Sequence, residues 1–240
     1  MAEKKLLYKR ILLKISGEAL KGKQEHGYDS EAVGQVVARI REALGLGVEI
    51  ALVVGAGNIW RGLAGSKTGM DRVTADHMGM LATAMNALCL KDAFTAAGVP
   101  CSVHSAVAME PFAKKFDRER ALAELSEGKL VIFACGTGSP YFTTDTGSSL
   151  RGIEIEADVM LKGTRVDGVY TADPEKDPTA TKFHDITYKE VLSRGLKVMD
   201  LTAICMCQDN NLPIYVFNMD QVGNLKRVID GEEIGTLVHN

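Results

Sequence analysis

Short, continuous apolar runs alternate with segments of helical periodicity along almost the whole chain. The clearest runs are "KRILLKI" (9–15), "VEIALVV" (48–54), "VPCSVHSAV" (99–107), "KLVIFAC" (129–135), "DVMLKG" (158–163) and "PIYVFN" (213–218). Runs of this kind are typical of strands that are buried on both faces of a parallel sheet. Strands that alternate with helices predict an α/β fold, a three-layer α/β/α sandwich with a mainly parallel central sheet.

The segments between the runs carry helix signals. In "DSEAVGQVVARIREALGLG", Asp29 or Ser30 can cap a helix whose apolar residues recur at helical spacing, and Gly45 or Gly47 can end it. Further helices are expected through 76–98, near 117–127, from about Gly147, around 187–194 and at 200–210. The methionines at 78, 80 and 85 are predicted to fill the core. We expect one domain, 1–240, with two lobes that divide near residue 150.

Charge and cysteine content exclude several classes of function. A net charge of −3 argues against a broad surface for nucleic acid or membrane, because such surfaces need a basic excess. Lys9, Arg10 and Lys14 interrupt every apolar core that a signal peptide would need. The cysteine count is odd and no C-x-x-C spacing occurs, so we expect reduced thiols in the cytoplasm and no zinc site.

The first loop that could hold a ligand follows the run at 9–15. "GEALKGKQ" (17–24) fits a phosphate-binding G-x-x-x-x-G-K pattern, but glutamine takes the position of the metal-binding hydroxyl and no helix signal follows. We therefore interpret Lys21 and Lys23 as part of a solvated turn. Lys14 lies at the end of the strand, where open α/β sheets place their ligands, and is the better candidate.

Three further strand ends carry polar or glycine-rich loops. "GAGNIWRG" (55–62) lacks the third glycine of a dinucleotide fingerprint, although its amides and Arg61 could approach a phosphate; a plain tight turn is equally compatible. "GTGSPYFTTDTG" (136–147) combines glycines and hydroxyls before a helix, which favours a ligand loop. "TRVDGVYTADPEKDP" (164–178) could be only a surface hairpin. In "KVMD", Asp200 stands at a helix start, and a role as helix cap would be enough to explain it.

Eight segments, taken together and in order, resemble the bacterial UMP kinases, a branch of the amino-acid kinase family. They are "KRILLKISGEAL", "GAGNIWRG", "DHMGMLAT", "GTGSPYFTTD", "LRGIEIEADV", "VDGVYTADPEKDPTAT", "LKVMDLTA" and "LPIYVFNM". The resemblance runs from about Tyr8 to the carboxyl terminus. It implies transfer of a phosphoryl group from ATP to UMP in pyrimidine nucleotide biosynthesis. It also implies a cytoplasmic homohexamer, activation by GTP, inhibition by UTP, and Mg²⁺ carried mainly by the nucleotide phosphates.

The resemblance also implies the site residues, with an acceptor-binding lobe at roughly 1–150 and an ATP-binding lobe at roughly 151–240. The catalytic residues would be Lys14, Arg61, Asp145 and Asp200. The ATP site would comprise Lys14, Ser16, Gly17, Gly57, Arg61, Thr164, Tyr170 and Asp173. The UMP site would comprise Gly55, Ala56, Asp76, Thr137, Gly138, Ser139, Pro140, Tyr141, Phe142, Thr143 and Thr144.

Two positions depart from the family pattern. Ala56 stands where glycine is usual, and Ser139 where asparagine is common. Segment 22–27, which aligns with a region tied to GTP activation, varies too much to transfer. Two alternatives stay open: a carbamate or amino-acid kinase of the same fold, and a non-catalytic nucleotide sensor.

Overall fold

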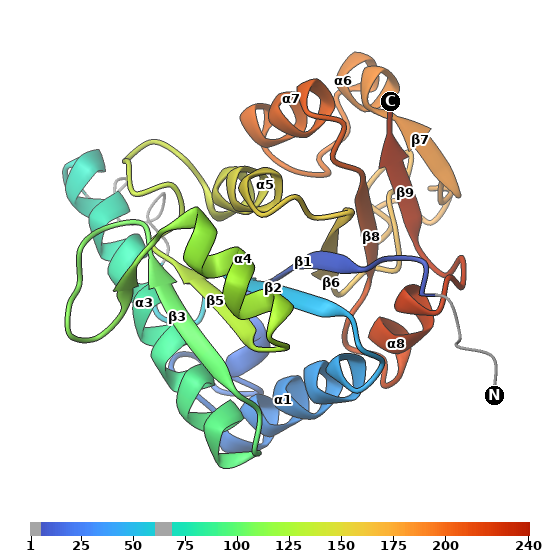
Figure 1. Ribbon diagram of the computed structural model, residues 1–240. Helices are drawn as coiled ribbons and strands as arrows, with labels where there is room; N and C mark the ends of the chain where they lie inside the picture. Colours follow the sequence, from blue (N-terminus) through green and yellow to red (C-terminus); the bar gives the residue numbers. More distant parts are fainter. Residues whose placement is uncertain (1–5, 61–68) are drawn as a thin grey trace, which may run out of the picture.

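All six apolar runs form strands, and these strands lie in one sheet (Figure 1). The computed structural model describes residues 6–60 and 69–240. The nine strands follow the order β4-β3-β5-β2-β1-β6-β8-β9-β7 across the sheet. They are β1 (Arg10–Ile15), β2 (Glu49–Val54), β3 (Cys101–Ser105), β4 (Lys114–Lys115), β5 (Leu130–Ala134), β6 (Val159–Thr164), β7 (Asp185–Thr187), β8 (Ile214–Asn218) and β9 (Thr236–His239). Within the described residues only β8 and β9 pair antiparallel, which confirms the mainly parallel sheet.

Helices cover both faces of this sheet, as the three-layer prediction required. The helices are α1 (Ser30–Leu44), α3 (Arg72–Ala96), α4 (Arg118–Ser126), α5 (Thr144–Glu154), α6 (Tyr188–Arg194), α7 (Leu201–Asp209) and α8 (Asn224–Ile229), with a short 3-10 helix, η1 (Gly17–Leu20). Helices α1, α3 and α8 pack on one face, and α4, α5, α6 and α7 on the other (Figure 1). Asp29 caps α1 as predicted, because its side chain accepts from the amide of Ala32.

The register of the two central strands determines where the candidate site can form. Along β1, Leu13 and Ile15 face the core under α1, whereas Leu12 faces the core under α5 and α7. Because side chains alternate along a strand, Lys14 lies on the same face as Leu12. Lys14 and Lys162 are paired neighbours in the parallel strands β1 and β6. Two lysines therefore leave the sheet side by side at its carboxyl edge.

The structure corrects the expectation for the methionines of α3. Met78 and Met85 are 36% and 52% exposed and do not fill the core, whereas Met80 is half-buried and packs against it. The reason is that α3 carries apolar residues on all sides, so their spacing does not reveal the buried face. Helix α5 also starts three residues before Gly147, at Thr144, where the Thr143 hydroxyl caps it. The expected division near residue 150 falls inside this helix.

Candidate active site

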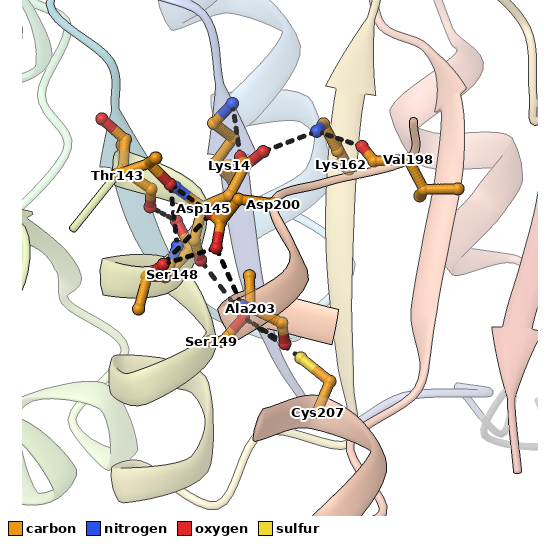
Figure 2. A network of polar contacts seen from close by, with 12 residues as sticks. Lys14, Thr143, Asp145, Ser148, Ser149, Lys162, Val198, Asp200, Ala203 and Cys207 are labelled. Carbon is orange, nitrogen blue, oxygen red and sulfur yellow. Dashed lines mark hydrogen bonds and ion pairs between the residues drawn. The ribbon is translucent and has the colours of Figure 1, made fainter. Parts of the chain in front are cut away.

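One carboxylate joins the two paired lysines (Figure 2). Asp145, in the first turn of α5, places one oxygen 2.8 Å from Lys14 Nζ and the other 2.8 Å from Lys162 Nζ. Lys162 also donates to the backbone oxygen of Val198 at 2.6 Å. All three charged side chains are at most 15% exposed. The cluster thus holds two ammonium groups and one carboxylate, a net charge of +1, at the carboxyl edge of the sheet.

The protonation states follow from this arrangement. Burial alone would raise the pKa of Asp145, but the charges of Lys14 and Lys162 outweigh burial and hold that pKa below its ordinary value. Burial lowers the pKa of Lys162, with Asp145 opposing the shift and Lys14 adding to it. Asp145 is therefore ionised at neutral pH and serves as the counter-ion of both lysines.

Asp200 connects the start of α5 to the start of α7. Its side chain accepts from the Thr143 hydroxyl, from the Thr146 hydroxyl at 3.0 Å, and from the Ala203 amide at 3.0 Å (Figure 2). The last bond is the helix cap expected from the sequence. Of the two aspartates expected among the catalytic residues, Asp145 contacts Lys14, and Asp200 instead positions the turn from which Asp145 projects.

A second layer of small polar groups supports Asp145 from behind. Ser149 donates to the backbone oxygen of Asp145 at 3.1 Å, and the buried Cys207 thiol donates to the Ser149 hydroxyl at 3.1 Å (Figure 2). Burial raises the pKa of Cys207 to about 11, so the thiol remains protonated and able to donate. This chain of bonds fixes α5 against α7, and with it the position of Asp145.

A cavity of about 780 Å³ opens beside Lys14. Its wall combines the strand end, the 55–57 loop, α3 and the loop before α5. Residues of the sequence-based set that line it are Lys14, Ser16, Gly55, Ala56, Gly57, Asp76, Thr137, Ser139, Phe142, Thr143 and Thr144. We call it the Lys14 cavity. Trp60, Arg72 and Met80 also line it, although the sequence analysis did not assign them to a site.

Buried amides fix the 55–57 loop against η1. Asn58 and Asn86 donate to each other's side-chain oxygens, and Asn86 also donates to the backbone oxygen of Gly55 at 2.7 Å. A Cβ added at Gly17 would lie 2.2 Å from that oxygen, so only glycine permits this approach of the two loops. Gly17 itself is buried and lines neither cavity.

A second cavity, of about 660 Å³, opens beside Lys162. Thr164, Tyr170 and Asp173 line it, as do Arg194 and Val198. The 164–178 segment is more than a hairpin, although Tyr170 does form an isolated antiparallel bridge with Lys182. We call this the Lys162 cavity. Each lysine of the central cluster therefore lines one cavity, and Asp145 bonds to both lysines.

The structure brings most, but not all, of the expected residues to these cavities. Gly138, Pro140 and Tyr141 belong to the loop before α5 but do not line the Lys14 cavity. Arg61 lies outside the described residues. Lys162 was missed by the sequence analysis, although "MLKGT" offered the same signal as "LLKIS", a lysine inside an apolar strand just before a hydroxyl residue.

Other kinds of site have less support in the part of the chain that the structure describes. There, no three His, Cys, Asp or Glu side chains gather closely enough to share a metal ion. Residues 6–60 and 69–240 also contain no helix that is long and apolar enough to cross a membrane. The buried pair of His104 and Glu124 lines neither cavity.

Comparison with known proteins assigns the chain to a family. The model of the amino acid kinase family matches residues 9–218. The uridylate kinase of Bacteroides thetaiotaomicron is 64% identical over 233 residues, which are 97% of this chain and 99% of that protein. The crystal structure of UMP kinase from Bacillus anthracis superposes with a TM-score of 0.94 at 36% identity, covering 97% and 96% of the two chains. That of UMP kinase from Ureaplasma parvum gives 0.91 at 35% identity, covering 97% and 99%. The chain therefore belongs to the amino acid kinase family, in the branch of the uridylate kinases.

Proposed function

We propose that this chain is a UMP kinase, which transfers the γ-phosphoryl group of ATP to UMP and yields UDP and ADP. The observation that carries the proposal is the Lys14–Asp145–Lys162 cluster between two cavities. The Lys14 cavity is the acceptor site and the Lys162 cavity is the donor site. Curated relatives that cover nearly the whole chain are named uridylate kinases, which supports this choice of acceptor.

The chemistry makes modest demands on the protein. The acceptor phosphate has a second pKa of about 6, so at neutral pH it is mostly a dianion and already nucleophilic. No general base is needed. The protein must instead align two anions that repel each other and stabilise the charge of the transferred group. Lys14 would approach this group from the acceptor side and Lys162 from the donor side.

Asp145 and α5 also contribute to the electrostatic environment of the reacting phosphates. Asp145 holds both ammonium groups at fixed positions while leaving the cluster with a net positive charge. The amino terminus of α5, where Thr143 and Thr144 line the acceptor site, offers the positive end of the helix dipole to the acceptor phosphate, while the amides of Asp145 and Thr146 donate to the Thr143 hydroxyl.

Mg²⁺ would be held mainly by nucleotide phosphates. Asp145 is already bonded to two lysines, and Asp200 accepts from two hydroxyls and one amide. These carboxylates therefore suit the orientation of cations and helices better than direct ligation of a metal. When bound, the ion would neutralise phosphate charge on the donor nucleotide.

Assembly and regulation are also part of the proposal. Met78, Leu81 and Met85 form an exposed apolar stripe along α3, which supports self-association into the expected homohexamer. Location in the cytoplasm, activation by GTP and inhibition by UTP follow from the family alone. Each requires its own measurement.

An acceptor panel tests the proposal. Purified protein, ATP and Mg²⁺ would be combined with UMP, CMP, aspartate, glutamate or carbamate, and the formation of ADP and of phosphorylated product measured. We expect UDP to form with UMP at a rate well above that of every other acceptor. Preference for carbamate or an amino acid would refute the acceptor assignment, and nucleotide binding without turnover would indicate a sensor.

A further inference from the structure

Arg72 links two walls of the Lys14 cavity. It lies in the first turn of α3, and its Nε donates to Asp76 Oδ2 at 2.8 Å. Its guanidinium carbon also lies 5.5 Å from the ring centroid of Tyr141, in the loop before α5. The backbone amide of Tyr141 donates to the same Asp76 oxygen at 2.8 Å. Arg72, Asp76 and Tyr141 thus form one cluster, which we call the Arg72 cluster.

The geometry of this cluster leaves one carboxylate oxygen available. In the described structure both hydrogen bonds to the Asp76 side chain arrive at Oδ2. Asp76 lines the cavity with a side chain that is 12% exposed, and in the part of the chain that the structure describes neither of these bonds occupies Oδ1. A carboxylate oxygen held in this way can accept from a sugar hydroxyl. Arg72 therefore controls the direction in which Asp76 presents its free oxygen.

Charge gives Arg72 a second effect. A carboxylate near the site of a dianionic acceptor would repel it, and the side chain of Asp76 is only 12% exposed, which limits screening by solvent. The positive charge of Arg72, which also lines the cavity, offsets that repulsion. One planar guanidinium can bond sideways to a carboxylate and stack on a ring at the same time, whereas a lysine ammonium cannot do both.

We propose that Arg72 is a positioning residue for the acceptor nucleotide: through Asp76 and Tyr141 it joins α3 to the loop before α5 and sets the affinity for UMP. This inference rests on the proposed function and deepens it. The backbone of Tyr141 supports it. Tyr141 is 66% exposed and has a φ of 72°, a left-handed conformation that a tyrosine rarely adopts without a compensating bond. The bond to Asp76 and the contact with Arg72 provide that compensation.

Steady-state kinetics with both substrates varied would test the inference. In Arg72→Lys, which keeps the charge but loses the planar geometry, the KM for UMP should rise about tenfold, the ratio that corresponds to losing one charge-assisted contact. The kcat and the KM for ATP should stay within about twofold, because the central cluster is untouched. Titration of UMP without ATP should show the same loss of affinity. Arg227→Gln is the matched control. It breaks the ion pair between Arg227 on α8 and Glu232, and it should leave all constants unchanged.

A double-mutant cycle separates joint action from separate effects. Arg72→Lys combined with Tyr141→Ala should raise the KM for UMP less than the product of the two single effects, because both changes remove the same contact between the guanidinium and the ring, while the backbone bond of residue 141 to Asp76 remains. Multiplicative effects, an unchanged KM for UMP, or an equal rise in the KM for ATP would overturn the inference while leaving the proposed function standing. A wild-type chain that does not phosphorylate UMP would overturn both. Circular dichroism checks that each variant is folded. If Arg72→Lys does not fold, the KM for UMP of Tyr141→Ala, which changes an exposed residue, still tests the inference.

Discussion

At the scale of single residues, Lys14 is the group on which turnover should depend most. It lines the Lys14 cavity, the proposed acceptor site, and Asp145 fixes its ammonium group. Lys14→Ala should lower kcat by about 10² to 10³, the usual effect of removing one donor that stabilises transition-state charge. The KM for UMP should change far less, and initial rates with UMP varied at saturating ATP would measure both constants.

Lys129→Ala is the control for this change, because Lys129 is half-buried, lines neither cavity, and forms an ion pair only with Glu127 in the described structure. It should retain full activity. A Lys14→Ala enzyme with unchanged kcat would remove Lys14 from the transition state.

The sequence identified Lys14 but not Lys162, and the reason is physical. Both lysines interrupt an apolar strand two residues before a hydroxyl residue, but only Lys14 is also followed by a serine–glycine pair that signals a loop. The relation between the two lysines exists only through the pairing of β1 with β6, across 148 positions of the chain. Local spacing cannot reveal such a pair, although a charged residue inside a buried strand is itself a signal.

At the scale of elements, the position of α5 should control acceptor binding. A Cβ added at Gly147 would lie 2.8 Å from the Cα of Gly136, backbone at the start of the loop before α5. Gly147→Ala should therefore displace that loop and raise the KM for UMP about tenfold. It should do so even though alanine is favoured over glycine in helices by about 1 kcal/mol. Kinetics and thermal denaturation would measure the two effects.

Gly152→Ala on the same helix is the matched comparison. A Cβ at Gly152 would meet the end of the Leu212 side chain at 2.9 Å, and a flexible side chain can rotate away. Its KM for UMP should remain close to that of the wild type. Equal increases in the two variants would show that the helix, and not its contact with Gly136, is responsible.

The central elements could be predicted from the sequence, and those at the edge could not. Six strands carried apolar runs because both of their faces are buried. Strands β4 and β7 have only two and three residues, and α8 only six, too few for any periodicity to emerge. Strand β9 exists because it pairs with β8, a relation that the sequence of "TLVH" does not contain.

The contact between α4 and the edge of the sheet should depend on pH. Ser102 Oγ lies 2.5 Å and His104 Nε2 lies 2.7 Å from one oxygen of Glu124, and Lys114 pairs with the other. Burial opposes ionisation, but these bonds outweigh it and lower the pKa of Glu124 to about 2. A lowered carboxyl pKa stabilises the fold above the ordinary value of 4.5 and loses that effect as the pH falls towards 2.

Urea denaturation between pH 7 and pH 3 would test this contact. Glu124→Gln should lower the free energy of unfolding at pH 7 by about 2 to 3 kcal/mol and should flatten its decline below pH 4.5. Glu119→Gln, at an exposed position of the same helix, should leave the curve unchanged. An unaltered decline in Glu124→Gln would assign the acid sensitivity to other groups.

At the scale of the whole molecule, both halves of the chain contribute to one sheet and to one charged cluster. Lys14 comes from the first half, Lys162 from the second, and Asp145 from the helix that crosses the expected boundary near residue 150 (Figure 1). The Lys14 and Lys162 cavities are thereby joined through the paired central strands β1 and β6. Independent movement of two lobes would disrupt the ion pairs of Asp145, so we expect the halves to unfold together.

Helix α3 has an exposed apolar stripe, and this stripe should mediate assembly. Leu81 and Met85 on α3 are 53% and 52% exposed, and Met78 extends the stripe by three residues along one face of the helix. A helix face of this kind is stabilised by packing against an equivalent face, because symmetric contacts bury identical patches from both copies.

Leu81→Glu would place like charges opposite each other at such a contact. It should shift sedimentation velocity profiles from the expected hexamer towards smaller species. Val222→Glu, at an apolar position that is 83% exposed but lies outside the stripe, should leave assembly intact, and dissociation in both variants would exclude α3 as the contact.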